Sequence, residues 1–275
     1  MKHFDPHDLQ KLSTPDDASH KGQNGKLMLV GGSKLFHAAS LWALTVASRL
    51  VDMVYYASVA ENNEIVTQAK AEFRNGIVVP RDKIESYATE ADVILIGPGL
   101  PRPDGQEEGD DDTKALTERL FNAFPDKKWV IDGGSLQTIR PEQLPKQAIL
   151  TPHQREFTGL FDLEPTTENA QHMAEKYGVV IVLKGEVDYV CSPDRSIEVH
   201  GGNGGMTKGG TGDVLAGLIA ALACTNDLFL AASAGSYLNK KAGESLAIRV
   251  GYAFNASDLA AELPSVMHRL IENRE

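Results

Sequence analysis

The sequence contains only two cysteines among its 275 residues, Cys191 and Cys224. They lie far apart and form neither a CxxC pair nor a zinc-ligand spacing, so nothing indicates a disulfide framework, and free thiols in a reducing cytoplasm are expected. Long apolar runs are also lacking. The longest one, residues 214–224, is much shorter than the roughly 20 residues that a membrane-spanning helix needs, so no membrane partner is expected.

Positive charge is scarce as well. Lys and Arg number 27 against 38 Asp and Glu, which gives a net charge of −11 and a pI of about 5.2. No cluster of Lys and Arg supplies the basic face that nucleic acid requires, so nucleic acid is not an expected partner. The first ten residues, MKHFDPHDLQ, are polar and acidic without an apolar centre. They predict no signal peptide and, with the cysteine usage, a soluble cytoplasmic protein.

The composition is that of a globular protein. Hydrophobic residues make up 42% of the chain and charged residues 24%, which excludes a disordered or low-complexity protein. A chain of this length can bury a large core without disulfides. We predict one domain over residues 1–275, with the polar residues 1–25 as an N-terminal arm because prolines and glycines punctuate them.

Short apolar runs that end in polar or glycine-bearing turns recur along the chain. They predict strands at residues 26–30, 54–59, 91–96, 129–131, 148–150 and 179–183. Residues 38–51 predict a buried helix, and residues 188–192 and 197–200 a hairpin. Runs without polar alternation are typical of strands buried on both faces. The pattern therefore predicts an α/β fold with a central, mostly parallel sheet flanked by helices on both faces, and ligands at the carboxyl ends of its strands.

The densest chemical signal is the glycine-rich stretch 201–217, GGNGGMTKGGTGDVLAG. Its centre is the turn Gly209, Gly210, Thr211 and Gly212. An apolar helical run follows with Asp213 in its first turn. Backbone N–H groups at such a helix start suit a phosphate, and Asp213 can accept a proton from a substrate hydroxyl during phosphoryl transfer. The stretch matches neither a Walker A loop nor a dinucleotide fingerprint, and plain helix capping is the alternative.

Two further turns carry polar side chains toward the same predicted edge. In TPHQRE, residues 151–156, the proline permits a helix just after it, so His153 and Glu156 share one helical face. They can face a phosphate-bound Mg²⁺ through water, or a substrate amide; an ordinary helix start with an acidic first turn is the alternative. Lys184 ends the buried run 179–183 and is expected at the ligand edge, with a lysine that snorkels to solvent as the alternative.

The order of these motifs resembles the ADP/ATP-dependent NAD(P)H-hydrate dehydratase family, a branch of the ribokinase-like superfamily. The matching segments are SHKG at 19–22, GGS at 31–33, IGPGL at 96–100, LTPH at 150–153 with Glu156, LKG at 183–185, and the stretch 202–217. GGTGDVLAG alone indicates the superfamily, whereas SHKG and LTPH beside it are specific to this family. The family's separate epimerase domain is not expected in this chain.

The resemblance implies a ribokinase-like fold and a metabolite-repair lyase. Such an enzyme uses ATP or ADP, with Mg²⁺, to restore hydrated NADH or NADPH to the intact dinucleotide. The resemblance also implies a homo-oligomer, often a tetramer.

The resemblance further assigns roles to individual residues. Asp213 activates the ring hydroxyl of the hydrated nicotinamide for phosphorylation, after which phosphate is eliminated. Gly210, Thr211 and Gly212 complete the catalytic set, because the amides of residues 209–212 hold the transferring phosphate. The residues that contact the hydrated dinucleotide are Ala39, Gly99, His153 and Asp213. Those that contact the adenine nucleotide are Lys184, Gly185, Glu186, Val187, Asp188, Gly209 and Gly212. Glu156 acts on Mg²⁺ through water.

The sequence departs from the family pattern mainly on the proposed substrate side. FHAA at 36–39 replaces Tyr-x-Gly-Ala, LVD at 50–52 replaces Gly-x-Gly, Pro101 replaces a glycine, and DGG at 132–134 replaces Asp-Ala-Asp. These departures leave open a hydroxymethylpyrimidine- or hydroxyethylthiazole-kinase-like enzyme, which would release a phosphorylated product. A non-catalytic nucleotide-binding protein is a third hypothesis, and the presence of Asp213 argues against it.

Overall fold

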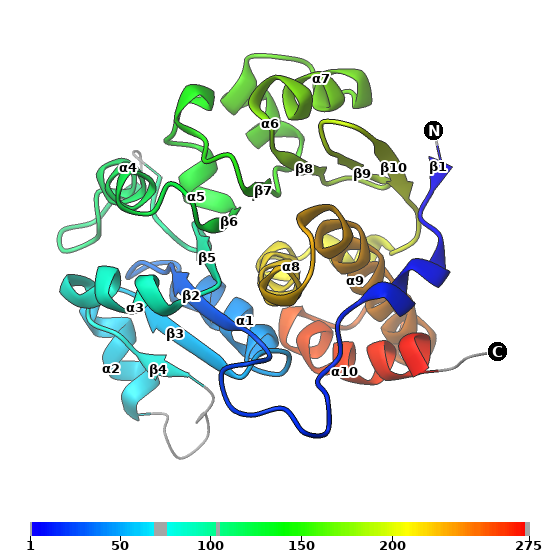
Figure 1. The fold of residues 1–275 in the computed structure, drawn as a ribbon, viewed down its shortest axis with the longest axis horizontal. Coiled ribbons are helices and arrows are strands. Elements are labelled where there is room, and N and C mark those ends of the chain that lie inside the picture. The colour runs from blue at the N-terminus through cyan, green and yellow to red at the C-terminus, as the bar shows by residue number, and fades with distance from the viewer. Residues whose placement is uncertain (1, 69–75, 103–104, 273–275) are drawn as a thin grey trace.

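A ten-stranded sheet runs through the structure (Figure 1), a computed structural model that describes residues 2–68, 76–102 and 105–272. The strand order is β1-β10-β9-β8-β7-β6-β5-β2-β3-β4. The strands are β1 Lys2–His3, β2 Lys26–Val30, β3 Met53–Ala57, β4 Ile77–Val78, β5 Val93–Ile96, β6 Lys128–Ile131, β7 Ala148–Leu150, β8 Val180–Leu183, β9 Asp188–Cys191 and β10 Ser196–Val199. Neighbours pair in parallel except at β9, which is antiparallel to both β8 and β10.

Helices cover both faces of this sheet (Figure 1). The α-helices are α1 His37–Ala47, α2 Ala60–Gln68, α3 Ile84–Glu90, α4 Thr113–Ala123, α5 Gly133–Leu136, α6 Gln154–Phe161, α7 Thr167–Tyr177, α8 Thr211–Thr225, α9 Leu228–Val250 and α10 Ala256–Glu272. Short 3-10 helices are η1 Pro6–Lys11, η3 Arg81–Lys83, η5 Pro141–Gln143 and η6 Gly204–Thr207. No helix in the described part of the chain combines the length and hydropathy needed to cross a membrane.

Successive side chains of each central strand enter two different cores. In β2, Leu27 and Leu29 pack on the side of α1, α8, α9 and α10, whereas Met28 and Val30 pack on the side of α3, α4, α6 and α7. All four side chains are fully buried. Both faces of the strand must therefore be apolar, which explains the absence of polar alternation. The predicted α/β fold with a mostly parallel sheet is confirmed.

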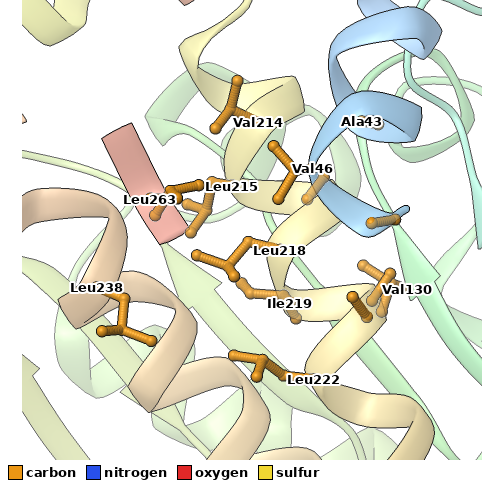
Figure 2. Packing of buried hydrophobic residues seen from close by; sticks show 14 of the residues in the cluster. Ala43, Val46, Val130, Val214, Leu215, Leu218, Ile219, Leu222, Leu238 and Leu263 are labelled. Carbon is orange, nitrogen blue, oxygen red and sulfur yellow. The ribbon is translucent and has the colours of Figure 1, made fainter. Parts of the chain in front are cut away.

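Helix α8 forms the centre of the first core. Its side chains Val214, Leu215, Leu218, Ile219 and Leu222 pack among residues of α1, α9, α10 and β6 (Figure 2). Gly217 explains how closely the neighbouring helix approaches, because a Cβ at this position would lie 2.6 Å from the Cα and the carbonyl oxygen of Ala43 in α1. The apolar body of α8 thus fixes the direction in which its first turn points.

The predicted elements agree with the structure apart from some boundaries. The six central strands and the hairpin, β9 with β10, are all present. β3 ends at Ala57 rather than at residue 59, and α1 ends at Ala47 rather than at residue 51. Val51 is nevertheless buried and donates its N–H to the carbonyl of Ala47. The apolar residues after Ala47 belong to a buried turn beyond the end of α1. Their spacing in the sequence does not distinguish such a turn from a continuing helix.

The N-terminal arm is more integrated than the sequence predicts. β1 pairs in parallel with β10 at one end of the sheet, and Phe4, Leu9 and Leu12 are buried in the core that contains α8. The N–H of Ser13 also donates to Oδ1 of Asn226 over 2.8 Å. Three isolated apolar residues among polar ones form no helical or strand period, so their burial was not visible in the sequence.

Candidate active site

Three neighbouring strands are each followed by a polar residue at one edge of the sheet. These residues are Asp132 after β6, Thr151 after β7 and Lys184 after β8. Thr151 Oγ1 donates to Asp132 Oδ1 over 2.7 Å, and Lys184 Nζ lies 3.1 Å from the same oxygen. Burial by itself disfavours the charge of Lys184, but the carboxylates of Asp132, Glu156 and Asp213 outweigh it and raise its pKa. Lys184 therefore keeps its positive charge although it is buried.

Helix α8 begins at the same edge with a turn that only glycine can make. Its N-cap residue is Gly210 with φ +93°, where a Cβ would lie 2.4 Å from ring carbons of Trp42. No side chain caps this helix start, and the first-turn amides of Gly212 and Asp213 have no acceptor within the helix. A Cβ on Gly212 would lie 3.4 Å from Lys184 Nζ. Free amides with a lysine ammonium beside them are groups whose charge suits an anion.

Thr211 holds this turn in place. Its Oγ1 donates to the carbonyl oxygens of Met206 over 2.7 Å and Lys208 over 2.9 Å. The side chain is buried, so it fixes the loop before α8 and leaves the backbone to face a ligand. The sequence had placed Thr211 in the catalytic set without separating the role of its side chain from that of its amide.

Asp213 occupies the first turn of α8 with a perturbed carboxyl group. Burial is the main cause, and the negative charge of Asp132 adds to it, so that the pKa rises from 3.8 to about 7 despite the opposing charge of Lys184. A carboxyl group with this pKa is present in both protonation states near neutral pH. It can accept a proton and later return it, which is the requirement for a general base.

His153 and Glu156 lie together, as predicted, but they cap each other. His153 is the N-cap residue of α6, and its Nδ1 accepts the N–H of Glu156 over 3.1 Å. Glu156 Oε2 accepts the N–H of His153 over 2.9 Å, and its Oε1 accepts from Gln137 Nε2 over 3.0 Å. Glu156 is buried, whereas the His153 side chain is 47% exposed. The ordinary helix-start interpretation thus describes the bonds that these residues make, and the exposed imidazole stays available to a ligand.

An open cavity of about 720 Å³ lies beside the start of α8. Its walls are formed by the turn after β8, by the glycine-rich loop and by α9, and they include the predicted nucleotide-binding residues Lys184, Gly185, Glu186, Val187, Asp188 and Gly212. A smaller hollow of about 360 Å³ is lined by His153, Gln154, Arg155, Lys184 and Gly185. Lys184 and Gly185 therefore form a wall that the two hollows share.

Asp188 stabilises the turn between β8 and β9. Its Oδ1 accepts the N–H of Gly185 over 2.9 Å and lies 3.3 Å from Lys240 Nζ, and its Oδ2 accepts from Ser236 Oγ over 2.7 Å. Lys240 also donates to the carbonyl oxygens of Gly185 and Glu186. The carboxylate is thus bonded within the protein and shapes the cavity wall.

The cavity wall contains a polar group without a partner. Asn239 in α9 is 5% exposed and lines the cavity, and its Oδ1 has no hydrogen-bond partner in the described structure. A buried amide oxygen left unpaired costs free energy unless a ligand or water satisfies it. This feature fits a cavity that takes a ligand rich in polar groups, such as a nucleotide.

Ala39 and Gly99 meet at the neighbouring part of the same edge. Gly99 follows β5 with φ +71°, and a Cβ on it would lie 2.9 Å from the Cβ of Ala39. A Cβ on Gly97, two residues earlier, would lie 1.8 Å from the carbonyl oxygen of Asp132. The turn after β5 therefore lies directly against the residue that pairs with Lys184. Gly209 lies in the glycine-rich loop, and nothing lies within 4 Å of its Cβ position.

Three residues of this edge were missed as site residues at the sequence level. Asp132 follows a buried strand in the way that Lys184 does, so its position at a strand end was a usable signal. Asn239 and Lys240 lie within the long helix α9, where no local pattern separates them from solvent-facing residues. Their burial depends on the hairpin that packs against α9.

The carboxylates at this edge do not form a direct metal-ligand cluster. The donor atoms of Asp132, Glu156 and Asp213 do not all lie within 4.8 Å of one another. Over residues 2–68, 76–102 and 105–272, the group that meets this spacing is His3, Glu198 and His200. The hard oxygens of the three carboxylates at this edge still suit Mg²⁺, which usually binds through a few carboxylates, phosphate oxygens and water. The residues therefore fit an ion that enters together with a phosphate.

The fold and the site together define an α/β protein that has free backbone amides at the start of α8 and an open cavity of about 720 Å³ beside them. The family model for NAD(P)H-hydrate dehydratase matches residues 27–265. The chain therefore belongs to the NAD(P)H-hydrate dehydratase family.

Two curated relatives show how the match is distributed. The chain is 35% identical over 270 residues to the "Bifunctional NAD(P)H-hydrate repair enzyme Nnr" of Methanocaldococcus jannaschii, which covers 94% of this chain and 51% of that protein. It is 32% identical over 268 residues to the "ADP-dependent (S)-NAD(P)H-hydrate dehydratase" of Cenarchaeum symbiosum, with 90% of each chain covered. The chain thus spans about half the length of several bifunctional relatives.

A solved structure supports the fold. The ADP/ATP-dependent NAD(P)H-hydrate dehydratase of Bacillus subtilis, co-crystallised with ATP and Mg²⁺, aligns with a TM-score of 0.81 at 24% identity and covers 98% of both chains. The ribokinase-like fold predicted from the motif order is confirmed.

Proposed function

We propose that this protein catalyses the ADP- or ATP-dependent dehydration of hydrated NAD(P)H back to NAD(P)H. The observation that carries the proposal is Asp213, a half-buried carboxyl group with a pKa of about 7 at an uncapped helix start, next to Lys184. This group can deprotonate an alcohol beside a bound phosphate. A relative that matches 90% of the chain is named as an ADP-dependent enzyme of this activity.

The adenine nucleotide is assigned to the 720 Å³ cavity, a volume within the range of small-molecule sites. Residues 184–188 form one wall, and Gly212 and Asn239 lie on others. The phosphates then reach the start of α8, where the amides around Gly209 and Gly212 and the Lys184 ammonium accept negative charge. The unpaired Oδ1 of Asn239 gains a partner when the cavity fills.

The hydrated dinucleotide is assigned to the other side of Lys184. His153 lines the smaller hollow there, and Ala39 and Gly99 meet at the adjoining turn. In this proposal the two substrates lie on opposite sides of the wall formed by Lys184 and Gly185, and Asp213 in the first turn of α8 acts on the substrate hydroxyl. Relative to the family pattern, Ala38 and Pro101 each replace a glycine. Both replacements concern the half of the site that is proposed to bind the hydrated dinucleotide.

The reaction divides into two steps. Asp213 takes the proton of the ring hydroxyl while that oxygen attacks the terminal phosphoryl group. The bond from that phosphorus to the bridging oxygen breaks, so ATP leaves as ADP or ADP leaves as AMP, and the first-turn amides with Lys184 stabilise the charge on the phosphoryl oxygens. The carbon–oxygen bond then breaks, phosphate leaves, and loss of a proton from the neighbouring carbon restores the ring double bond. Phosphorylation thus converts a poor leaving group, hydroxide, into a good one.

Magnesium is proposed to enter with the nucleotide and to neutralise phosphate charge when bound. Glu156 is the proposed outer partner, because each of its oxygens accepts one hydrogen bond within the protein and a carboxylate oxygen can accept a second one from water. Its negative charge also contributes to the raised pKa of Lys184.

The proposed function is tested by following the near-ultraviolet absorbance of reduced nicotinamide. Purified protein is mixed with hydrated NADH or NADPH, Mg²⁺ and either ADP or ATP. A rise that needs protein and nucleotide is expected, and the better nucleotide identifies the phosphoryl donor. A flat trace with both nucleotides, in protein that still binds them, would contradict the dehydratase assignment.

The kinase alternative predicts a different product. A kinase of the hydroxymethylpyrimidine or hydroxyethylthiazole type would use the same Asp213 and anion site but release a phosphorylated alcohol. Mass spectrometry of the reaction separates the two, because a dehydratase releases free phosphate and accumulates no phosphate ester of its alcohol substrate. Family membership and the near-full-length match to the named dehydratase favour the dehydratase.

We further propose a homo-oligomer in the cytoplasm. The homo-oligomer rests on the family resemblance, and the two free cysteines fit a reducing compartment such as the cytoplasm. Light scattering of the purified chain tests the first part and cell fractionation the second. A monomer at working concentration, or recovery outside the cytoplasmic fraction, would contradict it.

A further inference from the structure

A group of metal-binding side chain types lies at the end of the sheet that carries β1. His3 belongs to β1 and pairs in register with Glu198 of β10, and His200 follows β10 directly. The N–H of Phe4 donates to the carbonyl oxygen of Glu198 over 2.9 Å. The backbone of the two strands therefore fixes the positions of all three side chains relative to one another.

The donor atoms of these three side chains converge. His3 Nδ1 lies 3.4 Å and His200 Nε2 lies 2.9 Å from the same oxygen, Oε2 of Glu198. The ligand atoms of all three lie within 4.8 Å of one another. Among the described residues, this is the group of three or more His, Cys, Asp or Glu side chains that meets this spacing. The two imidazole rings also pack edge to face, with centroids 4.7 Å apart.

We propose that His3, Glu198 and His200 form a binding site for one borderline divalent transition-metal ion, represented by Zn²⁺. Two imidazoles and one carboxylate form a common zinc donor set, and a water molecule completes the tetrahedron. The site lies outside the hard-oxygen donor set at the start of α8, and it does not depend on the proposed function.

The spacing of the donors fits such an ion. With metal–ligand bonds of about 2.0–2.2 Å, two tetrahedral ligands lie about 3.4 Å apart. The His3–Glu198 distance is already 3.4 Å. The His200–Glu198 distance of 2.9 Å is that of a hydrogen bond, and it lengthens by about half an ångström when an ion replaces the shared proton.

The exposure of the group permits metal entry. The side chains of His3 and His200 are 69% and 52% exposed, whereas that of Glu198 is 24% exposed. An ion can thus approach from solvent and keep a water ligand on the open side. Because His3 lies in β1 and Glu198 in β10, with His200 directly after β10, the bound ion joins the N-terminal strand to the hairpin. His200 also lines the 720 Å³ cavity, so the metal lies at its rim.

The test is titration of the full chain with Zn²⁺ by calorimetry, in buffer without nucleotide or Mg²⁺, beside the variants His3→Ala, His200→Ala and Glu198→Gln. We expect one site per chain in the unaltered protein and at least a tenfold loss of affinity in each variant, since even outer partners of metal ligands change affinity by about 10–100-fold. His7→Ala is the matched control, because it removes an exposed imidazole from the same arm, and it should bind as the unaltered chain does.

Cobalt provides a second readout. The visible absorption of Co²⁺ is intense in a tetrahedral site and weak in water, so it reports geometry as well as binding. Intense bands are expected for the unaltered chain and His7→Ala, and not for the three ligand variants. Absence of a saturable site in the unaltered chain overturns the proposal. The proposal is also overturned if Glu198→Gln and His200→Ala bind the metal with the affinity of the unaltered chain, because the metal then lies elsewhere. Circular dichroism confirms that each variant is folded before titration.

Discussion

Lys184 is the residue at which the charges of the candidate active site meet. Its ammonium pairs with Asp132, lies beside Gly212 and faces both hollows. The charges of Asp132, Glu156 and Asp213 together outweigh the cost of burying its ammonium and raise its pKa. Burial first, and then the charges of Asp132 and Glu156, raise the pKa of Asp213 to about 7, so the same two carboxylates favour a charged lysine and a protonated aspartate.

The first prediction concerns turnover. Asp213→Asn should lower kcat by about 10²-fold or more, because an amide cannot accept the proton of the substrate hydroxyl. Nucleotide affinity should change little, since the amide is close in shape to the carboxyl group. Steady-state kinetics and a nucleotide titration on the same preparation check both parts. Near-normal turnover in this variant would remove Asp213 from the mechanism.

The same residue predicts a pH dependence of stability. The folded-state pKa of Asp213 is about 7 against an ordinary value of 3.8, so the folded chain binds a proton that the unfolded chain has lost between these values. Stability from this group is therefore present below about pH 4 and is lost as the pH rises toward 7. Asp213→Asn, which stays uncharged, should melt above the unaltered chain at pH 8, by about 2–4 °C for each kcal/mol of stability that the buried charge costs.

The comparison across pH is the control for that prediction. The melting-temperature difference should shrink between pH 8 and pH 5, because the unaltered carboxyl group becomes protonated in the folded chain. A constant difference over this range would show that charge is not the cause. Scanning calorimetry at three pH values gives the answer.

At the scale of elements, α8 combines two tasks. Its first turn presents free amides beside Lys184, and its apolar body fills the core between α1, α9 and the sheet. The β9–β10 hairpin makes this possible. β9 runs antiparallel to β8, away from the edge that carries Lys184, and β10 runs back to that edge. The glycine-rich loop after β10 therefore leads into α8 next to the end of β8.

A change in the first turn should act on nucleotide binding. Gly212→Val should abolish productive binding, because its γ carbons extend past the Cβ position, which already lies 3.4 Å from Lys184 Nζ, and enter the anion site. Gly212→Ala should have a milder effect, since its Cβ alone makes an ordinary contact. Titration with ATP and ADP measures both variants. Unchanged affinity in Gly212→Val, with an unchanged melting temperature, would contradict the loop assignment.

A change in the helix body should act on stability. Alanine normally stabilises a helix by about 0.5–1 kcal/mol relative to glycine, but a Cβ on Gly217 would lie 2.6 Å from backbone atoms of Ala43. Gly217→Ala should therefore lower the free energy of unfolding by about 1–3 kcal/mol, the cost of overpacking. Gly159→Ala in α6 is the matched control, because nothing lies within 4 Å of its Cβ position, and it should stabilise. Urea denaturation compares them.

At the scale of the whole molecule, the N-terminal arm belongs to the core. Leu9 is fully buried and packs in the same cluster as α9 and α10. Leu9→Ala should lower the free energy of unfolding by about 3 kcal/mol through the lost contacts and the cavity. Lys11→Ala, an exposed change in the same 3-10 helix, should stay within about 0.5 kcal/mol. A small effect of Leu9→Ala in urea denaturation would show that the arm is detached from the cooperative unit.

The amount that the sequence predicted varies with the kind of signal. The central strands could be predicted because both faces of each are apolar. Asp213 could be predicted because it directly follows the glycine turn 209–212, and Lys184 because it directly follows the buried apolar run 179–183. The burial of Leu9 and the position of Asn239 could not, because both depend on contacts between segments far apart in the chain. His153 and Glu156 were placed together by their spacing, but only coordinates show that they bond to each other.

The packing of α8 has a consequence for the precision of the reaction. From Thr225 back to Asp213 the helix is about 18 Å long, at about 1.5 Å per residue. A tilt of α8 by about 3° around its C-terminal end displaces the carboxyl group of Asp213 by roughly 1 Å. A displacement of this size can lower the rate by about 10²-fold. Substitutions near Leu222, far from any substrate, are therefore expected to appear in kinetic measurements as losses of catalytic alignment.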